Sequence, residues 1–376
     1  MSWENNVRRV TPYTAGEQPK GKVIKLNTNE CPYAPSPMVA TRIYDLAQQE
    51  IDGSSSMLRK YPDMDATKLV DAVVKVYNDR YFSDDKNTGE NKQADTGLNF
   101  DNVFVGVGSD DVLSMAFMTF FNSDKPVLFP DITYSFYDVW AQVHRIPYKV
   151  QPLTEDFSID INDYLDKENG GIAIPNPNAP TGVYEDPEMF EKIVSSNPDS
   201  VVIVDEAYID FGGRSCLPLI KKYDNLLVVQ TFSKSRSLAG LRVGIAFGCE
   251  KLINYLKDVK FAFNSYTLNY PAIELATVSV LDTQYFNETV KKVIRTREWT
   301  KEKLKELGFS FRDSKTNFIF ARHEKVSADE IFTKLREKDI YVRHWNKQRI
   351  DNYLRISIGT DEEMKELVKV LKEIVS

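Results

Sequence analysis

Six short apolar runs recur along the middle of the chain, and most are followed by a segment with helical spacing. Most of the runs are apolar at consecutive positions and rich in β-branched residues, which is typical of strands buried on both faces of a mostly parallel sheet. The runs are Val103–Val107, Val127–Phe129, Gly171–Ile174, Val201–Val204, Leu226–Gln230 and Val243–Phe247. Strands that alternate with helices predict an α/β layered domain.

The pattern changes near Tyr270, where one long helical region begins and runs to about Leu307. Three strand-like pieces and a final helix from Asp361 follow; the pieces are Asn317–Ala321, Ile340–Arg343 and Tyr353–Ile358. We therefore expect a large domain over residues 35–269. A smaller α+β domain is expected over residues 1–34 and 270–376, with an N-terminal arm.

Two further segments are assigned from local pattern. Asp65–Tyr81 has apolar residues at helical spacing, so it is predicted to be a helix. Ser83–Gly97 is polar and rich in Gly, Asn and Asp, so it is predicted to be a surface loop.

Composition excludes several classes of protein. The net charge of −7 argues against a nucleic-acid binder, which needs an excess of Lys and Arg. Three cysteines and three histidines lie far apart, so neither a disulfide framework nor a metal site is expected. The first residues lack the apolar stretch of a signal peptide, and the apolar runs are too short to span a membrane. We expect a cytoplasmic protein that binds small molecules.

The candidate chemistry follows the predicted strands, because ligands of open parallel sheets bind at the carboxyl ends of strands. Gly106–Asp111 follows the first run with small residues that let backbone N–H groups approach an anion, although an N-capped turn explains it equally well. Asp205 follows Val201–Val204, and an acid held there can keep a heterocyclic nitrogen protonated. Lys234 follows Leu226–Gln230, where a desolvated Lys becomes a usable amine nucleophile.

Four motifs in this order carry a family resemblance: GSD, NPNAPTG (Asn176–Gly182), DEAY and SKSRSLAGLRVG. Together they resemble the fold-type I aminotransferases, which use pyridoxal 5′-phosphate. The likeness is greatest to the histidinol-phosphate aminotransferase branch. It extends from VTPY and NTNECPYAPSP, through RKYPD, to YVR and LRISIGT. The resemblance implies a large domain with a mostly parallel seven-stranded sheet sandwiched by helices, and a homodimer with shared active sites.

The resemblance also implies roles for individual residues around the cofactor. Lys234 is similar to the lysine that carries the cofactor as a Schiff base and then moves a proton, and Asp205 to the acid that pairs with the ring nitrogen. Tyr208 resembles the tyrosine that contacts the cofactor O3′, and Tyr134 the aromatic residue that stacks on the ring. The remaining cofactor contacts implied on this chain are Gly108, Ser109, Asp110, Thr231, Ser233 and Arg242.

The resemblance points to two further cofactor contacts, one from the partner subunit and one near Ala179. Tyr61, in RKYPD, resembles a tyrosine that reaches the cofactor phosphate from the partner subunit. Many relatives place Asn directly before PTG to contact O3′, but this chain has Ala179 there. Asn178 is the candidate replacement.

For the substrate, the resemblance implies that Arg355 binds a carboxylate and that Arg343 helps to hold a phosphate, since a guanidinium fits either anion. Tyr13 and Asn29 resemble N-terminal substrate contacts. The expected reaction is amino transfer between L-glutamate and imidazole-acetol phosphate by a ping-pong route. Decarboxylation of L-threonine O-3-phosphate, transamination of aromatic amino acids and a cofactor-binding regulator without turnover remain alternatives on the same fold.

Overall fold

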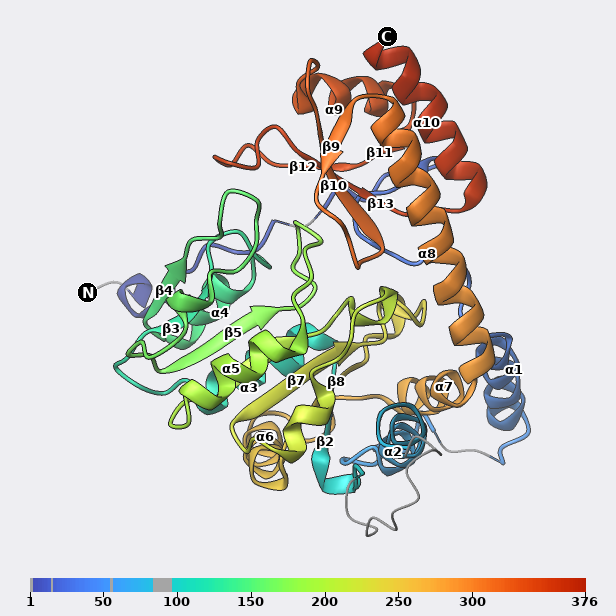
Figure 1. Cartoon of the computed structure of the whole chain (residues 1–376). Helices are drawn as coiled ribbons and strands as arrows, with labels where there is room; N and C mark the ends of the chain where they lie inside the picture. Colours follow the sequence, from blue (N-terminus) through green and yellow to red (C-terminus); the bar gives the residue numbers. More distant parts are fainter. Residues whose placement is uncertain (1–2, 15, 55–56, 84–96) are drawn as a thin grey trace, which may run out of the picture.

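The fold is described from a computed structural model, which covers residues 3–14, 16–54, 57–83 and 97–376 (Figure 1). Its largest element is a seven-stranded sheet in the order β2-β8-β7-β6-β5-β3-β4. β8 runs antiparallel to both of its neighbours, and the other pairings of this sheet are parallel. The strands are β2 Val103–Gly106, β3 Val127–Pro130, β4 Tyr148–Gln151, β5 Gly171–Pro175, β6 Val202–Asp205, β7 Leu226–Thr231 and β8 Gly244–Phe247. The predicted mostly parallel seven-stranded sheet is confirmed.

Both faces of this sheet are covered by helices. Successive side chains of a strand point to opposite faces, so they enter two different cores. Val202 and Val204 of β6 pack in one core, while Ile203 between them packs in the other. The first core is formed with α1 Pro37–Ile51, α2 Thr67–Tyr81, α5 Pro187–Ser196 and α7 Tyr270–Leu281. The second is formed with α3 Ser109–Phe120, α4 Tyr137–His144 and α6 Glu250–Phe263. Burial on both faces explains why the strands read as continuous apolar runs.

A smaller, fully antiparallel sheet lies above the large one in Figure 1, in the order β12-β13-β10-β9. Its strands are β9 Phe309–Phe311, β10 Phe318–His323, β12 Arg343–His344 and β13 Leu354–Ser357. It shares a core with the helices α8 Thr283–Glu306, α9 Ala328–Glu337 and α10 Asp361–Val375. Beside it, β1 Ile24–Lys25 pairs in parallel with β11 Ile340–Tyr341, so the N-terminal segment joins the C-terminal part of the chain.

Short 3-10 helices complete the described secondary structure. They are Trp3–Asn6, Phe100–Asn102, Ile161–Asp163, Ile209–Phe211, Leu217–Lys221 and Ala239–Leu241. Within the residues that the structure describes, no helix has both the length and the apolar composition to cross a membrane. The predicted loop Ser83–Gly97 lies, apart from its two end residues, outside the described part of the chain.

The long helical region predicted from Tyr270 to Leu307 is two helices. Asp282 leaves the helical conformation, with φ −83° and ψ 72°, and its carboxylate accepts from the backbone N–H of Tyr285 to cap α8. The first of the two helices, α7, packs beside α1 and α2 in a core of the large sheet. The division into two domains at residues 269 and 270 stays a prediction. In sequence α7 falls on the small-domain side of that boundary, but it packs in a core of the large sheet.

Candidate active site

Two adjoining cavities lie where β6 and β7 end. We call the first the strand-end cavity; the predicted site residues that line it alone are Ser109, Asp110, Asp205, Thr231, Ser233 and Arg242. We call the second the arginine cavity; the predicted site residues that line it alone are Tyr13, Asn29, Arg343 and Arg355. The two cavities share a wall made by Thr28, Tyr134, Ala179, Tyr208 and Lys234. The structure therefore gathers most of the predicted site residues around one divided space.

Lys234 places its amine on the shared wall. The chain leaves β7 at Thr231 and reaches Lys234 three residues later, so the end of a buried strand fixes the start of its side chain. Its Nζ donates to the backbone carbonyl of Thr28 at 3.3 Å and lies 5.6 Å from the ring centre of Tyr208. A primary amine between two cavities is placed to react with a group in either one.

Asp205 is a buried carboxylate at the end of β6. Its Oδ2 accepts from the hydroxyl of Tyr137 at 3.0 Å, and its Oδ1 accepts from the backbone N–H of Ala207 at 3.2 Å. Burial raises the pKa of Asp205 to about 6, while the Tyr137 and Ala207 hydrogen bonds act in the opposite direction. A buried carboxylate that is costly to ionise favours a cationic N–H group in the strand-end cavity.

An anion cradle lies at the other end of the strand-end cavity. Gly108, with φ +84°, precedes α3, and the first turn of that helix presents backbone N–H groups without helical partners. Arg242 closes the cradle, with Nη1 3.5 Å from Ser233 Oγ and Nη2 3.2 Å from Asp110 Oδ2. A Cβ on residue 108 would lie 2.5 Å from Arg242 Nη2, so the close approach of that guanidinium requires glycine.

Two tyrosines of the shared wall are held by neighbouring side chains. The hydroxyl of Tyr134 donates to Asp110 Oδ1 at 2.7 Å. Burial is the main cause that raises the pKa of Tyr134 well above its ordinary value, and the negative charge of Asp110 is the second. Tyr208 accepts from Asn29 Nδ2 at 2.9 Å. Asn29 is itself buried and accepts from Ser357 Oγ at 2.9 Å, so it links Tyr208 to the small sheet. Asn29 therefore positions Tyr208 as well as lining the arginine cavity.

Two arginines of the small sheet face the arginine cavity. Arg355 Nη2 donates to the carbonyl of Asn27 at 2.9 Å, and its buried Nε has no hydrogen-bond partner among the described residues. Burial, with Arg343 as a further cause, lowers the pKa of Arg355. Arg343 Nη2 donates to the carbonyl of Thr14 at 3.2 Å. The neighbouring Tyr13 stacks on Phe136 with ring centres 4.3 Å apart. These donors form a site for an anionic group.

Three predicted site residues, Gly108, Asn178 and Tyr61, do not line either cavity, although Gly108 belongs to the anion cradle described above. Asn178 directs its Nδ2 to the carbonyl of Ile132 at 2.9 Å and to Thr181 Oγ1 at 3.0 Å, whereas Ala179 forms part of the shared wall. The structure thus does not bring Asn178 to the position that its proposed role requires. Tyr61 is 81% exposed and stacks on Tyr266, away from both cavities of its own chain.

Thr28, Tyr137 and Trp345 are among the residues of the site that sequence reasoning missed. Thr28 receives the Lys234 amine through a backbone carbonyl, which leaves no signal in the side-chain sequence. Tyr137 holds Asp205, and its position three residues after Tyr134 in one aromatic motif was a usable signal. Trp345 lines the arginine cavity two residues after Arg343, just beyond the end of β12, and an aromatic residue so close to a candidate arginine was a usable signal.

The donor set fits a planar heterocycle that carries a phosphate. The strand-end cavity has a buried carboxylate at one end and a glycine–arginine cradle at the other, with Lys234 and the two tyrosines between them. In the described part of the chain, no group of three or more His, Cys, Asp and Glu side chains is placed to hold a metal ion. The Arg242 guanidinium, the Ser233 hydroxyl and the Lys234 amine of the lining suit an organic ligand that carries an anionic group.

Comparisons with known proteins place this geometry in a family. The family model described as Aminotransferase class I and II matches residues 21–371. The chain is 50% identical over 374 residues to a histidinol-phosphate aminotransferase of Lactococcus lactis subsp. cremoris, strain SK11, covering 99% of this chain and 98% of the relative. It is 46% identical over 375 residues to a histidinol-phosphate aminotransferase of Clostridium botulinum, strain Kyoto, covering 100% and 98%.

The fold is shared with a solved structure at lower identity. The histidinol-phosphate aminotransferase of Sinorhizobium meliloti, in complex with pyridoxal-5′-phosphate, superposes with a TM-score of 0.80. The two sequences are 21% identical, and the match covers 94% of this chain and 90% of the other.

Proposed function

Because the chain belongs to the class I and II aminotransferase family, we propose that it moves an amino group between L-glutamate and imidazole-acetol phosphate, which gives L-histidinol phosphate. Identity near 50% over almost the whole length of relatives named histidinol-phosphate aminotransferase supports this choice of substrate. The structural observation that carries the chemistry is the amine of Lys234 on the wall between the two cavities. One side chain can thus reach both a cofactor and a substrate.

The cofactor is pyridoxal 5′-phosphate, and the strand-end cavity is its proposed site. When bound, it supplies a carbonyl for covalent attachment of amines and a ring that stabilises negative charge on the substrate carbon. Arg242, Ser233 and the backbone N–H groups at the start of α3 would hold its phosphate. Tyr134 would supply an aromatic face for the ring.

Asp205 and Tyr208 set the charge around the ring. The Asp205 carboxylate, buried and held by Tyr137, would keep a proton on the ring nitrogen, because neutralising a buried acid by an opposite charge relieves its desolvation. The Tyr208 hydroxyl accepts from Asn29 Nδ2, and its O–H would donate to the ring oxygen. Both groups would be in place before substrate enters.

Lys234 would move the proton in each half-reaction. Its Nζ would accept a proton from the substrate carbon that bears the nitrogen and would later donate it, acting first as base and then as acid. The carbonyl of Thr28 accepts a hydrogen bond from Nζ at 3.3 Å and would orient the amine between these two tasks. The shared wall keeps the amine within reach of both cavities.

The arginine cavity would bind the anionic end of each substrate in turn. Arg355 has a buried Nε without a partner among the described residues, which a phosphate or carboxylate oxygen would satisfy. Arg343 would add a second guanidinium beside it. Histidinol phosphate carries a phosphate and glutamate a carboxylate, so the same donors can serve both halves of a ping-pong reaction.

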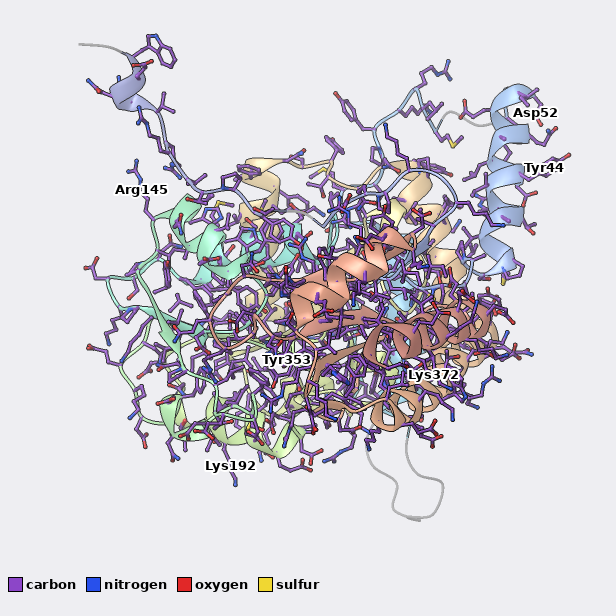
Figure 2. The ribbon with its side chains drawn as sticks, turned by 90° about the horizontal axis from the view of Figure 1, so that it is seen from above. Tyr44, Asp52, Arg145, Lys192, Tyr353 and Lys372 are labelled. Carbon is purple, nitrogen blue, oxygen red and sulfur yellow. The ribbon has the colours of Figure 1, made fainter. Side chains whose placement is uncertain are left out.

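We further propose a homodimer in which Tyr61 reaches the cofactor phosphate of the partner subunit. Large apolar side chains are exposed on α1, on the Leu58–Tyr61 segment and at the end of α6. They are Met38, Ile43, Tyr44, Ile51, Leu58, Tyr61, Phe263 and Tyr266. Figure 2 shows α1, with Tyr44 and Asp52 labelled, projecting from the edge of the molecule. A cytoplasmic location stays a prediction.

The test is to identify products. The purified, cofactor-loaded protein is incubated with L-histidinol phosphate and 2-oxoglutarate, and L-glutamate is measured over time. Glutamate formation at a rate far above that with phenylalanine as amino donor is the expected result. Release of carbon dioxide from O-phospho-L-threonine without glutamate formation would instead assign the decarboxylase reaction, and faster turnover of phenylalanine the aromatic aminotransferase.

A further inference from the structure

Arg343 and Arg355 face each other across two antiparallel strands. They are direct partners in the register between β12 and β13, so their side chains leave the small sheet on the same face. Both line the arginine cavity. Like charges directly opposite each other on neighbouring strands destabilise the pairing, so this arrangement needs a compensating contact.

Trp345 supplies that contact to both guanidinium groups. The guanidinium carbon of Arg343 lies 5.4 Å from the centre of the Trp345 ring, and that of Arg355 lies 5.2 Å from it. Arg355 also lies 5.4 Å from the ring centre of Phe318. An aromatic face attracts a cation through its quadrupole without neutralising it. The ring can therefore hold two arginines together without accepting a hydrogen bond from either guanidinium.

The Trp345 ring is held in turn by a contact with Phe320 and by the loop that follows it in the chain. The ring packs on Phe320 with centres 6.4 Å apart at an angle of 68°. Five residues to the C-terminal side, Ile350 is buried in the cluster with Phe320. Between them the loop is fastened to Asp131, which follows β3: Lys347 Nζ donates to its carbonyl at 2.9 Å and Arg349 Nη1 to its carboxylate at 2.9 Å.

We propose that Trp345 is a positioning residue that sets the selectivity of the site for phosphorylated and carboxylated substrates, by holding Arg343 and Arg355 side by side at the arginine cavity. The inference rests on the proposed function in that the anions are taken to be those of the two substrates. A carboxylate in place of the ring would also hold the arginines, but it would compete with the substrate anion for the same N–H groups. Trp345 therefore solves the pairing of two cations without occupying their donors.

Three variants of the cofactor-loaded protein test this role. Trp345→Leu keeps apolar bulk and removes the aromatic face, and Trp345→Phe restores a smaller face. Trp299→Leu is the matched control, since Trp299 packs in the core of the small sheet and lines neither cavity. Two amine substrates are compared in steady state: L-histidinol phosphate, and L-histidinol, which lacks the phosphate.

For Trp345→Leu we expect KM for histidinol phosphate and for glutamate to rise about tenfold, with kcat within about threefold of wild type. The ratio of kcat/KM between histidinol phosphate and histidinol should fall about tenfold. Trp345→Phe should recover most of the loss, and Trp299→Leu should leave the ratio unchanged. If the ratio is unchanged in Trp345→Leu, including the case in which kcat/KM falls equally for both amines, the proposal is overturned.

Binding of inorganic phosphate separates this proposal from the proposed function. Titration calorimetry on the loaded protein should show phosphate binding about tenfold weaker in Trp345→Leu than in wild type, whatever the enzyme's turnover. If phosphate bound more weakly to Trp345→Leu than to wild type but wild type transferred no amino group, the proposed reaction would fail and the role of Trp345 would stand. Equal phosphate affinity in both proteins would reject the role of Trp345 even in an active aminotransferase.

Discussion

The hydroxyl of Tyr137 donates a 3.0 Å hydrogen bond to the buried carboxylate of Asp205. Burial raises the pKa of Asp205 to about 6, and this hydrogen bond is the largest opposing influence. The ionised acid is the form that would hold a proton on the cofactor ring. If Asp205 pairs with the ring nitrogen as proposed, the balance between burial and its hydrogen bonds sets the pH range in which the cofactor binds well.

Replacing Tyr137 by Phe should move that range upward. The variant loses a hydrogen bond to a charged group, so the pKa of Asp205 rises and protonation of the free site begins at higher pH. The pH at which cofactor affinity begins to fall on acidification should rise by about one unit. The dissociation constant for pyridoxal phosphate between pH 5 and 9 measures it. Tyr164→Phe, at another buried tyrosine, is the control, and an identical profile in Tyr137→Phe would refute the assignment.

Glu206 makes a pH prediction about stability. It is buried beside Asp205, accepts from Ser215 Oγ and Cys216 N at 2.6 Å, and its pKa is raised by burial to about 7. A raised pKa means that its contribution to stability is full below the ordinary value of 4.5 and is lost as pH rises through 7. Glu206→Gln cannot ionise, so it escapes this loss.

The free energy of unfolding of Glu206→Gln, relative to wild type, should therefore increase between pH 5 and pH 8. Between the ordinary pKa of 4.5 and the raised pKa of about 7, this difference in unfolding free energy should grow by about 1.4 kcal/mol for each pH unit. Urea unfolding of the cofactor-free proteins at both pH values measures it. Glu324→Gln, at an exposed position, should show no such trend. A constant difference between Glu206→Gln and wild type would mean that Glu206 does not titrate as described.

Gly108→Ala tests the anion cradle. An added Cβ would meet Arg242 Nη2 at 2.5 Å, and φ at this position is +84°, so the variant combines backbone strain with displacement of the guanidinium. Gly53→Ala is a matched control for strain, with φ +74° and nothing within 4 Å of the added carbon. We expect the dissociation constant for pyridoxal phosphate to rise about tenfold or more in Gly108→Ala and to stay near wild type in Gly53→Ala. Equal affinities in the two variants would place the phosphate elsewhere.

Mixed dimers test whether Tyr61 acts on the partner's site. Lys234→Ala and Tyr61→Ala chains, each of which we expect to have little activity alone, are combined by unfolding and refolding them together. If Tyr61 serves the partner's site, half of the dimers are mixed and each contains one intact site, so about a quarter of wild-type activity returns. If Tyr61 serves its own chain, no intact site forms and activity does not exceed that of the separate variants.

The elements that the sequence predicted best are the strands in which every residue is buried. β6 and β7 read as continuous apolar runs because both faces of the sheet are covered, and both form as expected. β4 was not predicted because Tyr148, Lys149 and Val150 are exposed at the edge of the sheet, so no apolar run marks it. The end of α7 was not predicted because Asp282 stops the helix through capping, without a Gly or Pro to mark it.

The residues of the site likewise fall into those that the sequence could predict and those that it could not. Lys234, Asp205 and Arg242 were predictable because each follows a recognisable strand or motif, and the structure brings them to one cavity. Asn178 was chosen by proximity in sequence, but its side chain turns to Thr181 while Ala179 reaches the wall. The pairing of two arginines over one aromatic ring depends on cross-strand register, which a single sequence does not contain.

In the proposed reaction, Lys234 catalyses the transfer of the amino group of L-histidinol phosphate to the cofactor. The most direct measurement is a single half-reaction: loaded wild-type protein is mixed with L-histidinol phosphate alone, and the absorbance of the bound cofactor is followed in a stopped-flow instrument. Conversion of one equivalent to the aminated cofactor, without carbon dioxide release and absent in Lys234→Ala, is the predicted result. An unchanged spectrum in the wild-type protein, or conversion at the same rate in Lys234→Ala, would contradict the account.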